Sequence, residues 1–219
     1  MNLVLLDLDN TLLSGDTDVE WLDFLIEHGV LPESEHQANL DMDRRYRAGQ
    51  ADALEYVRFY LRFYPRLEMA TLVGLREKFV AGRIEPRMLP AARELIRSQG
   101  NNALVAIITA TNRFLTEPIA AAFGIDHLIA TEPQIVNRRF TGDIVGAPCM
   151  REGKIEHLER WLAARQKQLK DFAETWFYSD SINDLPLLSR VTHPVAVDPD
   201  ARLEKIARDR GWRMLTLRQ

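Results

Sequence analysis

The sequence predicts an α/β fold: a doubly wound parallel sheet with a helical cap domain inserted after the first strand. Apolar runs alternate with amphipathic helical patterns, as expected when strands and helices take turns along a chain. The apolar runs lie at 3–8, 102–109, 175–180 and 193–198. The helical patterns lie at 87–99, 113–123, 151–169 and 201–210. Because the runs lack a polar face, we expect strands that are covered on both sides.

Residues 15–84 differ from the rest because they contain no convincing strand pattern. In 19–30, apolar side chains fall close to one helical face, and glycines and prolines punctuate the helices that follow. We therefore predict a helical cap domain at 15–84 and a core made of 1–14 and 85–219. A hairpin-like excursion is expected between 131 and 146.

The composition excludes several classes of protein. The chain has 219 residues, a formal net charge of -4 and no dense Lys/Arg tract, so nucleic acid is not an expected partner. No stretch approaches the roughly 20 apolar residues that a membrane-spanning helix needs. Cys149 is the one cysteine, which excludes an internal disulfide. We expect a soluble cytoplasmic protein, and the sequence leaves its oligomeric state open.

Two carboxylates, Asp7 and Asp9, stand at the end of the first apolar run with one residue between them. Burying one ionised carboxylate costs free energy, and a second beside it costs more unless a cation compensates. One interpretation is that Asp9 and Asn10 are turn residues and Asp7 is incidental, since an Asp-x-Asp pair is common. The other is a site that needs both acids, and three distant features favour it.

Each of these features has a second interpretation. Thr109 ends a strand where a helix follows and could help bind an anion there, although Thr109 or Thr111 could equally cap the helix. Lys154 stands near a helix start, where the dipole disfavours a cation, although most lysines are solvated. Asp180 ends another strand, and Asp184 follows four residues later; alternatively, both belong to a capped turn.

Together the acids predict a cation site. In a doubly wound sheet, ligands bind beyond the carboxyl ends of the strands, where Asp7, Asp9, Asp180 and Asp184 are all expected. Four carboxylates at one edge repel one another unless a cation lies among them. Oxygen ligands favour Mg²⁺, which commonly shares its coordination with a substrate phosphate.

The pattern resembles the haloacid dehalogenase superfamily, specifically its phosphoserine-phosphatase-like branch (subfamily IB). The matching pieces are DLDNT at 7–11, Thr109 in IITAT, Lys154 in EGK and SDSINDLPLL at 179–188. They occur in the family's order and span nearly the whole chain. The stretches DTDVEWLDFL and EPQIVNRRFTG more closely resemble a bacterial group of histidinol-phosphatases.

The resemblance implies a Mg²⁺-dependent hydrolase of small phosphomonoesters that works through an aspartyl-phosphate. Asp7 would be the nucleophile and Asp9 the general acid and base. The metal would be held by Asp7, Asp180 and the backbone carbonyl of Asp9. Thr11 and Asp184 would support these groups from behind. The substrate's phosphoryl oxygens would be bound by Thr109, Ala110, Lys154 and Asn183.

One residue departs from the family pattern. Members often have glycine before the equivalent of Asp180, where this chain has Ser179. Serine is acceptable at this position if its backbone φ is negative. The departure therefore affects the detail of the metal site and leaves the assignment in place.

The resemblance also suggests how the substrate is held. Asp16 falls where phosphoserine phosphatases have a glutamate that grips an ammonium group, and Arg58 falls where they have an arginine that grips a carboxylate. Asp18 and Glu20 add negative charge nearby. This acidic trio would suit a cationic amino-alcohol phosphate such as histidinol phosphate, which we expect as the substrate, with phosphoserine as the alternative.

Three further alternatives remain open at this point. Phosphotransfer to an alcohol acceptor is one, and a binding module without catalysis is another, although every expected catalytic position carries a competent residue. The third concerns an aromatic cluster that could stack on an imidazole but is more simply explained by packing within the cap. Its members are Tyr56, Phe59, Tyr60 and Phe63.

Overall fold

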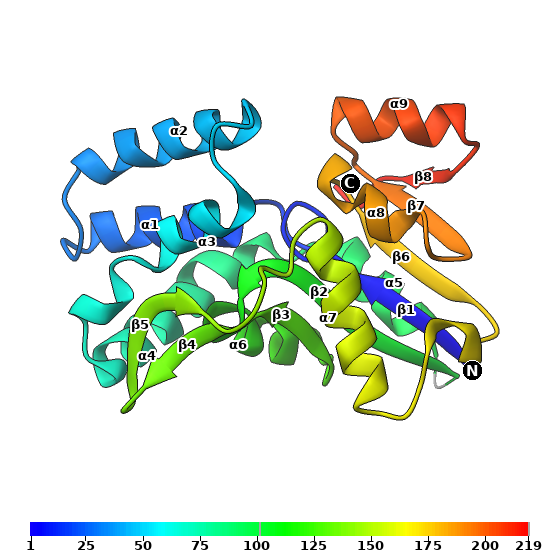
Figure 1. The fold of residues 1–219 in the computed structure, drawn as a ribbon, viewed down its shortest axis with the longest axis horizontal. Coiled ribbons are helices and arrows are strands. Elements are labelled where there is room, and N and C mark those ends of the chain that lie inside the picture. Colours follow the sequence, from blue (N-terminus) through cyan, green and yellow to red (C-terminus); the bar gives the residue numbers. More distant parts are fainter. Residues whose placement is uncertain (101, 219) are drawn as a thin grey trace.

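A parallel six-stranded sheet forms the centre of the molecule (Figure 1). The structure, a computed structural model, describes residues 1–100 and 102–218. The strand order is β3-β2-β1-β6-β7-β8, which confirms the predicted doubly wound sheet. The strands are β1 (Asn2–Leu6), β2 (Ala103–Asn112), β3 (Leu128–Thr131), β6 (Thr175–Ser179), β7 (His193–Val197) and β8 (Arg213–Leu215).

Strand β1 lies in the interior of the sheet and pairs with both of its neighbours. Leu5 lies opposite Ala106 of β2 and Phe177 of β6, and all three side chains are fully buried. Burial on both faces explains why this strand has no polar alternation in its sequence. The sequence did not predict the edge strands β3 and β8, which have four and three residues and are too short to show a period.

Alternate residues of each strand face two different hydrophobic cores. Val4 and Leu6 pack with α5 and α6, whereas Leu3 and Leu5 pack with α7, α8 and α9. In Figure 1, α7 lies in front of the sheet and α5 and α6 lie behind it. These helices are α5 (Pro90–Ser98), α6 (Arg113–Phe123), α7 (Glu152–Ala163), α8 (Leu185–Leu188) and α9 (Ala201–Asp209).

Helix α7 is shorter than the sequence pattern suggests. We expected a helix to residue 169, but it ends at Ala163. Gln166 then adopts a left-handed backbone with φ of 55°, which a right-handed helix cannot accommodate. The polar pattern continues past this point, so the sequence gives no sign of the break.

Residues 15–84 are helical, as predicted, and lie beyond the carboxyl end of β1 (Figure 1). Trp21 and Phe79 of this segment belong to the same buried cluster as Ile107 of β2, so the helices share a hydrophobic core with one face of the sheet. The division into domains at 15 and 84 remains a prediction. The α-helices of this segment are α1 (Thr17–Glu27), α2 (Ser34–Arg47), α3 (Ala53–Leu61) and α4 (Met69–Phe79).

A two-stranded antiparallel hairpin, β4 (Pro133–Val136) and β5 (Arg139–Ile144), occupies the place where we expected one. Its turn residues Asn137 and Arg138 both have left-handed φ angles, 50° and 63°, as tight hairpins require. The hairpin packs against the helical segment, because the Phe140 and Tyr64 rings lie 5.1 Å apart. Among the described residues, no helix is long and apolar enough to cross a bilayer.

Candidate active site

A cavity of about 530 Å³ lies between the carboxyl edge of the sheet and the helical segment. Its lining comes from segments far apart in the chain: the end of β1, the end of β2, the starts of α7 and α9, the loop after β6, and helices α1 to α3. The predicted residues that line it are Asp7, Asp9, Asp16, Thr109, Ala110, Lys154, Asp180, Asn183 and Asp184.

Lys154 is buried between two carboxylates at the floor of this cavity. Its Nζ lies 2.6 Å from Asp7 Oδ1 and 2.7 Å from Asp184 Oδ2, and its side chain is only 3% exposed. It is therefore not a solvated surface lysine. A Cβ on the preceding residue, Gly153, would overlap the carbonyl oxygen of Pro148, so only glycine permits this close approach of the chain.

The charges of this cluster depend on one another. Burial raises the pKa of Asp7 well above its usual value, with Lys154 opposing the shift and Asp184 and Asp180 adding to it. Burial alone would lower the pKa of Lys154, but Asp184 and Asp7 raise it above the ordinary value. The ammonium group is thus held in its charged form, and negative charge remains in excess around it.

Asp7 and Asp180 face each other across one hydroxyl group. Thr11 Oγ1 lies 3.2 Å from Asp7 Oδ2 and 3.2 Å from Asp180 Oδ1, and it accepts a hydrogen bond from the Asp180 backbone N–H at 3.1 Å. Burial and the nearby Asp184 carboxylate raise the pKa of Asp180 to about 7. The carboxylates that follow β1 and β6 therefore meet at Thr11. The positive charge of Lys154 compensates their mutual repulsion only in part.

The donor set suits a hard divalent cation. Asp7 and Asp180 each present a carboxylate oxygen to the hydroxyl of Thr11, and burial with the nearby Asp184 charge disfavours the ionised form of Asp180 unless a cation is bound. In the described part of the chain, no group of three His, Cys, Asp or Glu side chains forms a ready metal cage. Mg²⁺ does not need one, because it commonly keeps several waters and binds only one or two carboxylates.

Asp9 is held by four hydrogen-bond donors. Its Oδ1 accepts the Thr17 backbone N–H at 2.8 Å and also the Thr17 hydroxyl, which come from the start of α1. Its Oδ2 accepts the hydroxyls of Thr111 at 2.8 Å and Thr109 at 3.3 Å, which come from the end of β2. The sequence gives no sign of these contacts of Thr17 and Thr111, because they arise only when the two segments meet.

The helix-capping interpretation of Thr109 and Thr111 is wrong. The N-cap of α6 is Asn112, whose side-chain oxygen accepts the Leu115 backbone N–H at 3.3 Å. Thr109 is fully buried, and its hydroxyl oxygen accepts the Thr111 backbone N–H at 3.2 Å. Both threonines line the cavity, as does Ala110 between them.

Ser179, the departure from the family pattern, has a local role in this chain. Its hydroxyl donates to Asp184 Oδ2 at 2.7 Å, the same oxygen that Lys154 approaches. Ser179 is not among the residues with positive φ, so the backbone does not demand glycine here. Asp184 is thereby fixed beside Lys154 by two donors.

The part of the cavity formed by the helical segment is acidic. Asp16 and Asp18 of the α1 start and Asp43 of α2 line it, together with the rings of Tyr46 and Tyr56. Asp16 Oδ1 also caps α1 by accepting the backbone N–H of Asp18 at 3.0 Å. Asp43 and Tyr46 are three residues apart on one helix, but nothing in the sequence showed which face α2 turns toward the site.

Burial controls the protonation of these acids. It raises the pKa of Asp16 to about 7, with the Asp9 charge adding to the shift. It raises the pKa of Asp18 well above the usual value, with Asp16 and Asp9 contributing. A cation bound among them would favour their ionised forms.

Two residues expected at the substrate lie elsewhere. Arg58 does not line the cavity; its guanidinium is half exposed and pairs with Asp143 of β5 through contacts of 2.9 and 2.7 Å. Glu20 pairs with Arg87 at 2.8 Å and Arg83 at 3.6 Å. The positions of Arg58 and Glu20 in the sequence suggested that both reach the substrate. Sequence spacing does not show the ion pairs that hold these two side chains outside the site.

The aromatic cluster has mainly a packing role. Tyr60 and Phe63 are each 2% exposed and belong to the large core. Tyr56 is the member that lines the cavity, where its ring lies 4.6 Å from that of Tyr46. The expectation of core packing is thus met for Tyr60 and Phe63, whereas Tyr56 is available to a ligand.

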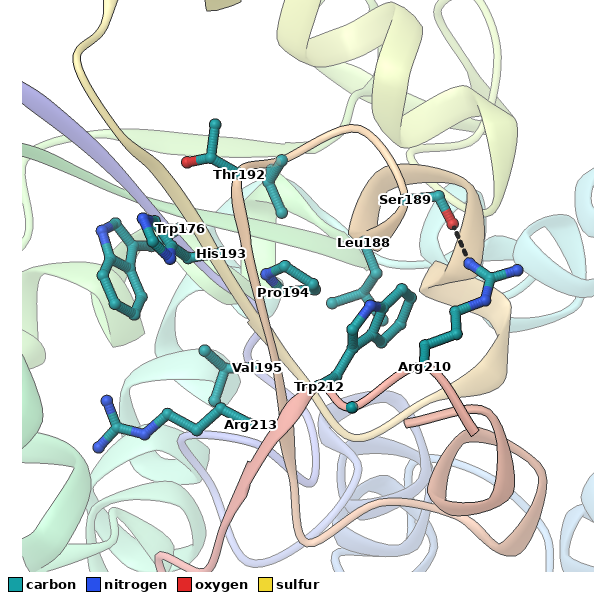
Figure 2. Close-up of a pocket in the computed structure, with 12 residues that line it drawn as sticks. Trp176, Leu188, Ser189, Thr192, His193, Pro194, Val195, Arg210, Trp212 and Arg213 are labelled. Carbon is teal, nitrogen blue, oxygen red and sulfur yellow. Dashed lines mark hydrogen bonds between the residues drawn. The ribbon is translucent and has the colours of Figure 1, made fainter. Parts of the chain in front are cut away.

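A second cavity, of about 560 Å³, lies at the opposite, amino-terminal end of β6, β7 and β8 (Figure 2). Trp176 stacks on His193 with centroids 4.0 Å apart, and Arg210 donates to Ser189 at 3.0 Å. None of its lining residues is an aspartate or glutamate. It therefore offers no nucleophilic carboxylate and no set of acidic metal ligands.

A parallel sheet with a buried aspartate at the end of β1, a lysine beside it and further acids after β6 defines a phosphoryl-transfer type of site. The family model of haloacid dehalogenase-like hydrolases matches residues 4–189. The chain belongs to this family.

Two relatives that match nearly the whole chain are named as phosphatases. A histidinol-phosphatase of Neisseria meningitidis is 40% identical over 222 residues, which cover 99% of each chain. Phosphoserine phosphatase SerB1 of Mycobacterium tuberculosis is 32% identical over 97% of this chain and 70% of its own length. The chain is therefore an enzyme of the phosphatase kind.

Solved structures agree with the fold. A Bordetella pertussis protein described as having unknown function superposes with a TM-score of 0.95 at 41% identity, covering 99% of this chain and 98% of its own. A phospho-aspartyl intermediate analogue of phosphoserine phosphatase superposes with a TM-score of 0.68 at 21% identity, covering 93% and 89%. At that identity the second likeness shows the fold alone.

Proposed function

We propose that the protein hydrolyses a cationic amino-alcohol phosphate, histidinol phosphate in particular, through an aspartyl-phosphate formed on Asp7. The observation that carries the proposal is the division of one cavity into two halves. Its floor holds Asp7 and Lys154, and Asp16, Asp18 and Asp43 line the upper half, on the side formed by the helical segment. Arg58, the arginine expected to bind a carboxylate, pairs with Asp143 instead, and the arginines that do line the cavity, Arg151 and Arg202, stand at the starts of α7 and α9.

The residues of the floor perform the phosphoryl transfer. Asp7 attacks phosphorus with a carboxylate oxygen while Lys154 and Thr109 bind the phosphoryl oxygens. As the bond from phosphorus to the ester oxygen breaks, Asp9 gives its proton to that oxygen, and the alcohol leaves. Asp9 then takes a proton from the water that attacks the aspartyl-phosphate, which releases phosphate and restores Asp7.

The acids at the floor also account for the metal requirement that we propose. Mg²⁺, when bound, supplies positive charge beside Asp7 and the phosphoryl oxygens. The side chains of Asp7 and Asp180 and the backbone carbonyl of Asp9 would hold it. Burial and the Asp184 charge, which together raise the pKa of Asp180 to about 7, support this assignment.

The upper half favours a leaving group that carries positive charge. Three carboxyl groups line it, and Tyr56 offers an aromatic face. Arg58, which would attract the carboxylate of phosphoserine, is engaged with Asp143. The 40% identity to the histidinol-phosphatase supports the same choice.

A panel of phosphomonoesters assayed with and without Mg²⁺ tests the substrate. We expect the highest kcat/KM for histidinol phosphate, lower values for aminoalkyl phosphates and the lowest for phosphoserine. Turnover of phosphoserine well above that of histidinol phosphate would overturn the substrate assignment and leave the phosphatase assignment standing.

The nucleophile is tested by Asp7→Asn, an amide of nearly the same shape. We expect kcat to fall by at least about a thousandfold on every ester of the panel, since no covalent intermediate can form. Asp209→Asn, on the exposed side of α9, is the matched control and should retain full activity. Appreciable turnover by the Asp7 variant would contradict its role.

A further inference from the structure

The hydroxyl of Thr111 occupies a position that the proposed mechanism does not yet use. Thr111 is 3% exposed and lies near the end of β2, and its Oγ1 is 2.8 Å from Asp9 Oδ2. The same Oγ1 is 3.4 Å from Asp18 Oδ2, at the start of α1. Because a hydroxyl has one hydrogen, the shorter contact to Asp9 takes it.

The two oxygens of Asp9 are held from different parts of the chain. Oδ1 is bound by Thr17 of the helical segment, and Oδ2 is bound by hydroxyls from the end of β2. Of those two hydroxyls, Thr109 is the more distant at 3.3 Å. In the proposed reaction Thr109 turns to the substrate's phosphoryl group, which leaves Thr111 as the donor from the sheet.

We propose that Thr111 is a positioning residue: its hydroxyl holds the Asp9 carboxyl group where it can protonate the departing alcohol. A carboxyl group rotates readily about its terminal torsion, and proton transfer requires hydrogen-bond reach to the ester oxygen. A hydroxyl on a buried strand fixes that rotation from a rigid support. This inference rests on the proposed function, because it assigns a step in the same reaction.

The leaving group provides the critical test. An alkoxide leaves only if it is protonated, whereas 4-nitrophenolate leaves without a proton. Loss of correct Asp9 placement should therefore slow hydrolysis of 2-aminoethyl phosphate far more than that of 4-nitrophenyl phosphate. The quantity to compare is kcat/KM, which covers the steps up to release of the alcohol and excludes the later attack of water.

Thr111→Val removes the hydroxyl and keeps the shape of the side chain. We expect kcat/KM for 2-aminoethyl phosphate to fall by about 30-fold or more, and that for 4-nitrophenyl phosphate to fall by less than about threefold. Thr111→Ser should restore both values to within about threefold of the wild type. If the valine variant does not fold, Thr111→Ala is measured in its place with the same expectation.

Thr116→Val is the matched control, because Thr116 is buried like Thr111 and its hydroxyl donates to the backbone carbonyl of Asn112 at 3.0 Å. It should leave the ratio of the two kcat/KM values unchanged. In an Asp9→Asn background, Thr111→Val should no longer change that ratio, since the proton donor is already absent.

Several results would overturn the inference. Equal losses on both esters, a serine variant as slow as the valine variant, or the same change of ratio in Thr116→Val would show a merely structural role. These outcomes leave the phosphatase assignment intact. Failure of the wild-type protein with Mg²⁺ to hydrolyse these two esters and histidinol phosphate would instead remove the proposed function, and the inference with it.

Discussion

The burial of Lys154 determines how much its ion pairs matter for the stability of the folded protein. Both of its partners are largely buried, with side chains 10% (Asp7) and 4% (Asp184) exposed, so water can replace the ammonium group only poorly. Removing one member of a buried ion pair leaves an uncompensated charge, which costs about 3–5 kcal/mol. The same side chain on the protein surface would contribute little to stability.

This contrast predicts a pH-dependent loss of stability in Lys154→Met. We expect the free energy of unfolding at pH 8 to fall by about 3 kcal/mol, because Asp7 and Asp184 then face each other without a cation. The loss should shrink toward pH 5, because burial raises the pKa of Asp7 and this carboxyl group then takes up a proton. Denaturant titrations at both pH values measure it, with Lys170→Met, an exposed position, as the control.

Asp16 predicts a pH dependence of substrate preference. Burial raises its pKa to about 7, so the acid is mainly neutral below that pH and mainly ionised above it. The ratio of kcat/KM for 2-aminoethyl phosphate to that for ethyl phosphate should therefore rise as the pH increases from 6 to 8. The ammonium group stays charged across this range. Because it lowers the second pKa of the neighbouring phosphate, each kcat/KM is expressed per phosphate dianion before the ratio is taken.

Asp16→Asn should remove most of that rise, because an amide does not ionise. The capping of α1 should survive, since an asparagine oxygen accepts the same backbone N–H groups. A ratio that keeps its full pH dependence in the variant would show that another group controls the preference.

At the scale of elements, the β4–β5 hairpin ties the helical segment to the core of the molecule. Arg58 of α3 pairs with Asp143 of β5, and a Cβ on Gly142 would lie 3.1 Å from Pro65. Arg139 of β5 also pairs with Glu68, just before α4. Arg58 thus joins α3 to β5 and is not available to bind the substrate.

We therefore predict that Arg58→Ala changes KM for histidinol phosphate by less than about threefold, because the side chain does not reach the cavity. Asp43→Asn, which alters the cavity lining, should raise KM for the same substrate by a larger factor. Steady-state kinetics on both variants decide between the positions. A strong KM effect of Arg58→Ala would restore the expectation drawn from sequence.

At the scale of the whole molecule, the buried carboxyl groups make folding depend on pH in an unusual direction. The pKa values of Asp7, Asp16, Asp18 and Asp180 are all raised, chiefly by burial. Above the usual pKa of an aspartate, the folded protein thus holds protons that the unfolded chain has lost. Stability then falls as pH rises toward 7 and beyond, rather than increasing.

This predicts that the metal-free protein has a lower Tm at pH 8 than at pH 5.5, and that Mg²⁺ raises Tm more at pH 8. Asp180→Asn should raise the Tm of the metal-free protein by several degrees at pH 8, since one repelling charge is gone, and should abolish most of the Mg²⁺ effect. Thermal unfolding with Mg²⁺ or with a chelator tests this, and Asp209→Asn should behave like the wild type.

Site residues could be predicted from the sequence where a reactive side chain stands at the end of a predicted strand. Asp7, Thr109 and Asp180 follow apolar runs whose parallel arrangement could be predicted, so their meeting at one edge could be predicted as well. Whether a helical side chain reaches the site depends on how its amphipathic helix is rotated about its axis. This applies to Arg58, Asp43 and Glu20. That rotation is set by packing between segments, which spacing along the chain does not reveal.

The continuous core beneath α1 and α4 has a practical consequence for protein engineering. Trp21, Phe24 and Phe79 of the helical segment pack in the same cluster as Leu6 and Ile107 of the sheet. The surfaces of the helical segment and of the sheet are therefore complementary in shape. Replacing the helical segment by that of a relative, in order to alter substrate selectivity, would leave side chains that pack poorly at the interface with the sheet. A productive chimera must carry the sheet-facing partners along with the grafted helices.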